Sequence, residues 1–151
     1  MSAGPPVDDL GAVEDWASGL LAKLSPVERR KLTRQLAAAL RQSQAKRIAE
    51  QKAPDGVPYA PRSSKRGLRG KKGRIRRSMF AKLRAARHLK AESTADEASV
   101  GFSGRDARIA GQHQDGSIRR LPRRVLLGFS QNELSITHEI ILHNFIAEKY
   151  Q

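Results

Sequence analysis

Two stretches in the first third of the chain repeat apolar residues every three or four positions, the spacing of a helix that buries one face. The first stretch, residues 8–24, carries Leu10, Val13, Ala17, Leu20, Leu21 and Leu24. The second stretch, residues 26–52, carries Leu32, Leu36, Leu40 and Ile48. Ser25 and Glu28 stand between the stretches at the spacing of a capping box. The pattern therefore predicts two helices that meet at Ser25.

A further helix is predicted over residues 130–149, where Ser130 and Glu133 repeat the capping-box spacing. Its apolar side chains fall on two faces. Ile136 and Ile140 form the narrower face, opposite a broad face of Leu134, Ile141, Leu142, Phe145 and Ile146. Because a surface helix needs only one apolar face, we predict that Ile136 and Ile140 are exposed on a monomer and form an oligomer interface.

Shorter elements are predicted between these helices. Pro54-Asp55-Gly56 is typical of a turn, and an extended segment follows around Tyr59. Spacing of Ile75, Met79, Phe80 and Leu83 predicts a helix over residues 75–87. Alternation on both sides of Asp96-Glu97 predicts a β-hairpin with strands near residues 89–93 and 98–102.

A short helix is expected over residues 106–114, ended by Asp115-Gly116, and a short strand over residues 117–121. Long helices at both ends and a small antiparallel sheet between them predict an α+β fold, since no strand–helix alternation is present. We expect a single domain made of three parts: a helical region over residues 1–53, a flexible basic loop over residues 54–74, and an α+β body over residues 75–151.

Charge is concentrated in one part of the chain. Lys and Arg outnumber Asp and Glu 29 to 15, and no acidic residue occurs between Gly56 and Ala91. Such a stretch predicts a polyanion or an acidic protein surface as partner, and charge alone leaves both open. Residues 62–77 are rich in glycine and lysine and hold almost nothing apolar to bury, so we expect them to be mobile in the free protein and to order only on docking. The candidate contacts are Arg62, Lys65, Arg66, Arg69, Lys71, Lys72, Arg74, Arg76 and Arg77.

Motifs for catalysis or metal binding are not found in the sequence. His138 and His143 stand five positions apart, whereas the zinc-protease helix needs histidines four apart. Ser103 lacks the nucleophile-elbow spacing, and the chain has no cysteine for disulfides or thiolate sites. No run of about 18 apolar residues predicts a membrane span. We therefore predict a non-enzyme without cofactor, catalytic or metal site, and without a membrane partner.

Several segments, in this order along the chain, resemble the phage virion morphogenesis family, which includes tail-completion proteins of temperate contractile-tailed phages. They cover residues 47–51, 54–61, 68–75, 79–84, 98–102, 108–110, 113–116 and 122–130.

The resemblance implies a structural subunit without catalytic residues. It would act in a homo-oligomeric ring, for which a hexamer is one admissible size, at the head-proximal end of the tail. Its partners would be the tail tube or tail terminator and the head connector, with double-stranded DNA in the lumen. The subunit would be assembled in the host cytoplasm and would be located in the tail–neck region of the virion. The alternative is a nucleic-acid-binding protein without sequence specificity, which the high basic charge also fits.

Overall fold

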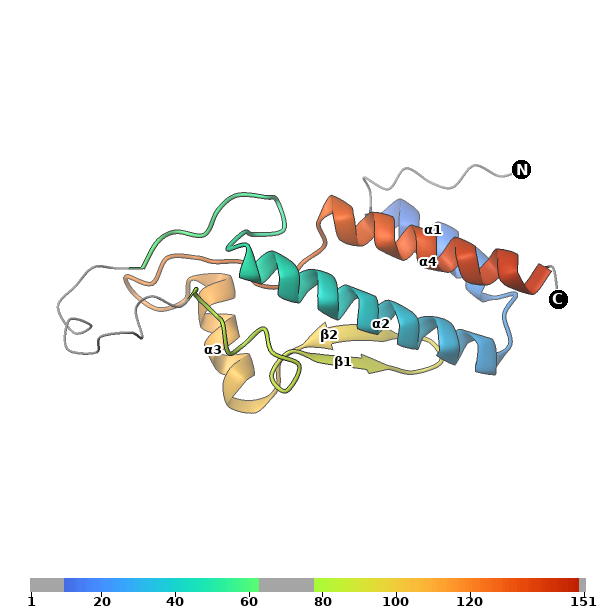
Figure 1. The fold of residues 1–151 in the computed structure, drawn as a ribbon, viewed down its shortest axis with the longest axis horizontal. Helices are drawn as coiled ribbons and strands as arrows, with labels where there is room; N and C mark the ends of the chain where they lie inside the picture. The colour runs from blue at the N-terminus through green and yellow to red at the C-terminus, as the bar shows by residue number, and fades with distance from the viewer. Residues whose placement is uncertain (1–9, 63–77, 150–151) are drawn as a thin grey trace. The chain divides into compact units, whose positions relative to one another are not determined.

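The computed structural model describes residues 10–62 and 78–149 and has an α+β fold, as predicted (Figure 1). Within those residues the elements follow the order α1 (Leu10–Leu21), α2 (Pro26–Ala49), β1 (Lys90–Ser93), β2 (Ala98–Gly101), α3 (Gly104–Asp115) and α4 (Gln131–Lys149). β1 and β2 form a two-stranded antiparallel sheet in which Lys90 pairs with Gly101 and Ser93 with Ala98. The chain divides into two compact units, each with its own apolar core.

The first unit consists of Met1–Ser43, Lys90–Gly101 and Phe129–Gln151. The predicted capping box begins α2, because the Ser25 amide donates to Glu28 at 2.6 Å and the Glu28 amide donates to the Ser25 hydroxyl at 3.3 Å. α1 lies beside α4 (Figure 1). The unit's core contains two leucines of the predicted α2 stripe, Leu32 and Leu36, together with Ala17, Leu24 and Ile141.

The β-hairpin is fastened to α2 within the first unit. Thr33 donates its hydroxyl proton to the Thr94 carbonyl. Arg29 forms an ion pair with Asp96 at 3.3 Å. At the hairpin turn, the Thr94 hydroxyl accepts hydrogen bonds from the amides of Asp96 and Glu97. The turn is therefore held by a local side chain as well as by strand pairing.

The second unit consists of Gln44–Leu89 and Phe102–Gly128, and polar side chains organise its loops. Its apolar core is formed by Ile48, Tyr59, Ala110 and Leu126. Buried Arg47 donates to the carbonyls of Leu126 at 3.1 Å and Lys52 at 3.3 Å, and to the side-chain oxygen of Gln44 at 2.9 Å.

Glycine is required where the Pro54 turn meets residue 128. A Cβ added at Gly128 would lie 2.8 Å from Cγ of Pro54, closer than side-chain carbons approach one another. α3 ends at Gly116, whose φ of 63° is the left-handed conformation that glycine adopts without strain. The predicted helix end at Asp115-Gly116 is therefore confirmed.

Two predicted elements are wrong. Residues 79–88 form successive turns instead of a helix, and residues 75–77 of the predicted helix lie outside the described residues. Phe80 has a φ of 63°, and Gln51 bonds both backbone groups of Met79 at 2.8 and 2.9 Å, so distant contacts replace the helical ladder. Residues 117–121 form a turn instead of a strand, because Leu121 donates to the Ile118 carbonyl at 2.9 Å and Arg120 has a φ of 71°.

Candidate assembly surface

The capping box at the start of α4 is confirmed and is tied to α2. The Ser130 amide donates to the Glu133 carboxylate at 2.7 Å, and the Ser130 hydroxyl also donates to it. Glu133 is fully buried, and its other carboxylate oxygen accepts a hydrogen bond from the Ser43 hydroxyl at 2.9 Å. The Glu133 side chain thus accepts hydrogen bonds from three donors, which satisfies a polar group that is fully buried. These bonds fix the position of α4 along α2.

One side of α4 faces α1 through ring contacts. The ring of His138 stacks on Trp16 with centroids 4.6 Å apart. Near the end of the helix, the Lys23 ammonium lies 5.6 Å from the centroid of Phe145, within the range of a cation–π interaction. Buried Ile141 joins the unit's core. This side of α4 is therefore occupied within the subunit.

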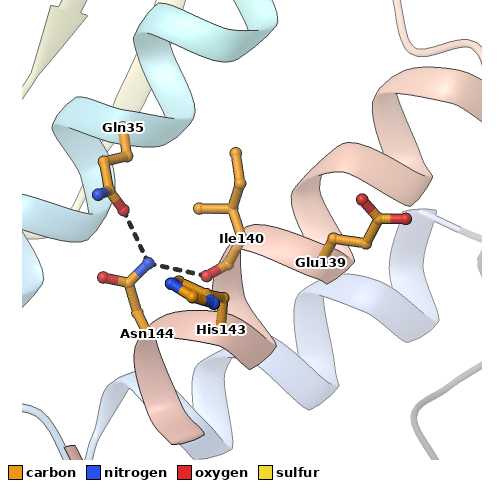
Figure 2. Close-up of a pocket in the computed structure, with 5 residues that line it drawn as sticks. All are labelled: Gln35, Glu139, Ile140, His143 and Asn144. Carbon is orange, nitrogen blue, oxygen red and sulfur yellow. Dashed lines mark hydrogen bonds between the residues drawn. The ribbon is translucent and has the colours of Figure 1, made fainter. Parts of the chain in front are cut away.

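The side of α4 that faces α2 carries an open pocket of about 540 Å³ (Figure 2). Asn144 donates to the side-chain oxygen of Gln35 at 2.7 Å and to the Ile140 carbonyl at 2.8 Å. Gln35, Glu139 and His143 are exposed along its edges. We call the pocket, lined by Gln35, Glu139, Ile140, His143 and Asn144, the α2–α4 groove.

This groove combines one apolar contact with amide, carboxylate and imidazole groups. Such a mixture resembles the composition of protein–protein interfaces, in which apolar contacts are surrounded by polar groups. The groove has no buried nucleophile paired with a base.

The structure changes the prediction for the second apolar face of α4. Ile136 and Ile140 are partly buried, not exposed, and Ile140 packs against the core of the first unit. Ile140 also lines the α2–α4 groove, so part of its surface stays accessible. On the broad face, Leu134 and Ile141 are buried but Ile146 is half exposed. The role of Ile136 and Ile140 in an oligomer interface remains a prediction.

Of the basic candidate contacts, Arg62 is described, and it is exposed. Lys65, Arg66, Arg69, Lys71, Lys72, Arg74, Arg76 and Arg77 lie outside the described residues. The backbone on both sides of them is held by side chains of the second unit. Before them, the Arg124 guanidinium donates to the carbonyls of Ala60 at 2.8 Å and Pro61 at 2.9 Å. After them, Gln51 holds Met79.

His113 lies between an aromatic ring and a positive charge. Its ring contacts Phe80 edge-on with centroids 4.8 Å apart, and its Nδ1 lies 3.5 Å from Nη1 of Arg124. Burial, and secondly the charge of Arg124, lower the pKa of His113 below its usual 6.5. The unfolded chain therefore takes up this proton at a higher pH than the folded chain does.

We expect the contribution of His113 to stability to be complete above pH 6.5 and to be lost as the pH falls from there towards the folded pKa. Urea midpoints at pH 7.5 and pH 5.5 measure the loss. The variant His113→Gln should lose less stability than the wild type over this interval, because it removes the group whose pKa is lowered. Equal losses in the two proteins would contradict the prediction.

Histidines of α4 have separate neighbours in the structure. His138 stacks on Trp16 while His143 lines the α2–α4 groove. Within residues 10–62 and 78–149, no three histidine, aspartate or glutamate side chains are grouped to hold a metal ion. In the same residues, no helix is long and apolar enough to cross a membrane.

The sequence alone did not indicate a role for Gln35 or Asn144, and it placed Trp16 only beside the apolar face of the first helix. Asn144 follows Ile140 by one helical turn, so a helical projection could have placed it beside the second apolar face. Gln35 and Trp16 reach α4 from other helices. No local pattern marks such contacts.

Two comparisons relate this chain to known proteins. The model of the phage virion morphogenesis family matches residues 8–145. The chain is also 44% identical over 139 residues to tail completion protein S of Escherichia phage P2, covering 85% of this chain and 92% of that protein. No solved structure matches. The residues that the family model matches include most of α4 and all five residues that line the α2–α4 groove.

Proposed function

This chain belongs to the phage virion morphogenesis family, and from that premise we propose that it completes the head-proximal end of a phage tail so that the tail can join a DNA-filled head. The observation that carries the proposal is the 44% identity to tail completion protein S of Escherichia phage P2 across 85% of the chain. The protein would have a structural role and would be located in the tail–neck region of the virion.

Subunits would close into a ring, in which each subunit uses one surface to contact the next. The α2–α4 groove is the surface we assign to this contact. Its occupant would be a second copy of this chain, because a ring that contains one kind of subunit must bury its own surfaces. Ile140 would supply the apolar contact at the floor of the groove, and Gln35 and Asn144 the polar contacts at its edge.

The finished ring would dock on the tail tube or tail terminator and on the head connector. On either side of the basic candidate contacts, Arg124 donates to the Ala60 carbonyl and Gln51 donates to the Met79 carbonyl. We propose that the positive charges between these two points bind a partner once the ring has docked. DNA in the lumen, or an acidic surface of a partner, would be their counterpart.

Purified protein should restore infectivity to a lysate of phage from which its gene has been deleted. Heads and tails would already be present in that lysate, so adding the missing subunit should let them join without new protein synthesis. The infectious titre before and after addition is the measurement. A titre that stays at background, with folded protein in excess, would contradict the proposal.

A further inference from the structure

A second arginine cluster lies outside the basic stretch. Residues 102–128 contain six arginines and two aspartates but no lysine. Arg124 is buried and holds the loop at Pro61, whereas the other five arginines are exposed. The exposed set is Arg105 and Arg108 on α3 and Arg119, Arg120 and Arg123 after it.

Two of these arginines occupy the tip of a tight turn. The Leu121 amide donates to the Ile118 carbonyl at 2.9 Å, so Arg119 and Arg120 are the central residues of the turn. Arg120 has a φ of 71°, a conformation that favours glycine or asparagine at this position. Strained residues of this kind concentrate at functional sites, where a particular side chain is needed.

The turn is fixed to the end of α3. The Arg123 side chain donates from Nε to the Gln114 carbonyl at 3.1 Å, and the Arg124 amide donates to the His113 carbonyl at 2.7 Å. Arg123 also passes close to the helix end, since a Cβ added at Gly116 would lie 3.2 Å from Cβ of Arg123. The two arginines at the tip are therefore presented from a rigid support.

The two aspartates of this segment are Asp106, in the first turn of α3, and Asp115, which is exposed at the end of α3. Asp106 is engaged by His88, with Nδ1 and Oδ2 2.6 Å apart. Within the described part of the chain, no ion pair joins Arg119, Arg120 or Arg123 to an acidic side chain. Their charges are therefore available to an external anion.

We propose that the turn formed by residues 118–121 binds backbone phosphates of duplex DNA. Guanidinium groups bind phosphate through two parallel hydrogen bonds, which suits a cluster made of arginine without lysine. Residues 103–128 contain no phenylalanine, tyrosine or tryptophan, and the ring of His113 packs against Phe80, so this segment offers no exposed stacking platform of the kind that single strands require. The inference rests on the proposed function, because a tail that joins a DNA-filled head must hold or pass the duplex.

The test compares DNA affinity in a variant that removes both charges without disturbing the turn. Asparagine tolerates a positive φ, so Arg119→Gln with Arg120→Asn should melt at a temperature no lower than the wild type. The probe is a duplex of random sequence, measured by fluorescence anisotropy between 50 and 200 mM salt. Each phosphate contact contributes about 0.9 to the steepness with which the logarithm of the affinity falls against the logarithm of the salt concentration. We expect a slope smaller by about 2 and an affinity about 50-fold lower at 100 mM salt.

A matched control is Arg30→Gln with Arg34→Gln, which removes two exposed charges from α2 in the first unit. It should change the slope little, because those residues lie outside the cluster. A second variant, Arg119→Lys with Arg120→Lys, should keep most of the slope, because lysine also neutralises phosphate.

Two results would overturn the inference. One is a loss of affinity in the double variant no larger than in the control. The other is unchanged DNA binding together with failure to join heads and tails, which would assign the turn to an acidic protein partner. Either result leaves the deletion experiment on tail completion unaffected, so the failure of this inference and of the proposed function can be distinguished.

Discussion

Replacing Arg47 with alanine is expected to lower the free energy of unfolding of the second unit by about 3–5 kcal/mol. The guanidinium is buried and donates to the carbonyls of Lys52 and Leu126 and to the side-chain oxygen of Gln44. Its Nη2 also lies 3.5 Å from the Gly128 carbonyl oxygen. Its removal would leave these carbonyls in a buried site without their donor. Domains of this size are stabilised by about 5–15 kcal/mol, so much of the unit's stability would be lost.

Urea denaturation followed by circular dichroism measures this effect. Lys46→Ala is the matched control, because Lys46 is the preceding residue of α2 but is exposed. It should change the free energy of unfolding by about 0.5 kcal/mol or less. Arg47→Lys should fall between the two, since an ammonium keeps the charge but cannot span the same carbonyls. An Arg47→Ala protein as stable as the Lys46→Ala protein would show that these hydrogen bonds contribute little.

Placing positive charges on the walls of the α2–α4 groove is expected to abolish self-association and reduce the infectious titre by several orders of magnitude. The double variant Gln35→Arg with Glu139→Arg changes exposed residues on two helices that line the groove. Long like-charged side chains would fill the groove and repel a neighbouring subunit. This variant is preferable to Ile136→Lys with Ile140→Lys, because Ile140 also packs against the core.

Glu14→Arg with Ser18→Arg is the control for the groove variant. Both residues are exposed on α1 of the same unit, and the net charge changes by the same amount. Light scattering gives the mass of each protein, and complementation of the deleted gene gives the titre. The control should associate and complement as the wild type does. If the groove variant associates to the same mass as the wild type, the α2–α4 groove is not the interface between subunits.

Elements with a local cause were predictable from the sequence. Both capping boxes form as their spacing indicates, because each needs only a hydroxyl and a carboxylate three residues apart. The hairpin follows from alternation on both sides of a turn. α3 ends at Gly116 because glycine adopts the left-handed conformation there.

Elements decided by distant residues were not predictable. The apolar spacing around Phe80 fits a helix, but Phe80 is held between Tyr59 and His113 and takes a left-handed conformation. Gln51 competes for the backbone groups of Met79 from 28 positions away. No window of local sequence contains these partners, so propensity gave the wrong result.

The candidate site was predictable only in part. Periodicity placed Ile140 on α4 but could not show that the α2 leucines and Ala17 form a core against which it packs. The groove beside it depends on Gln35, which meets Asn144 from another helix. Charge counting found the basic stretch. It did not identify the turn at Arg119 and Arg120, whose distinguishing feature is a backbone angle.

The most direct test of tail completion is electron microscopy of a lysate from phage whose copy of this gene has been deleted. We expect DNA-filled heads and full-length tails that remain separate, because DNA packaging and tube polymerisation would precede the step that we assign to this protein. Supplying the wild-type gene should restore joined particles. Absence of capsids, empty heads only, or joined and infectious particles in the deletion lysate would contradict this expectation.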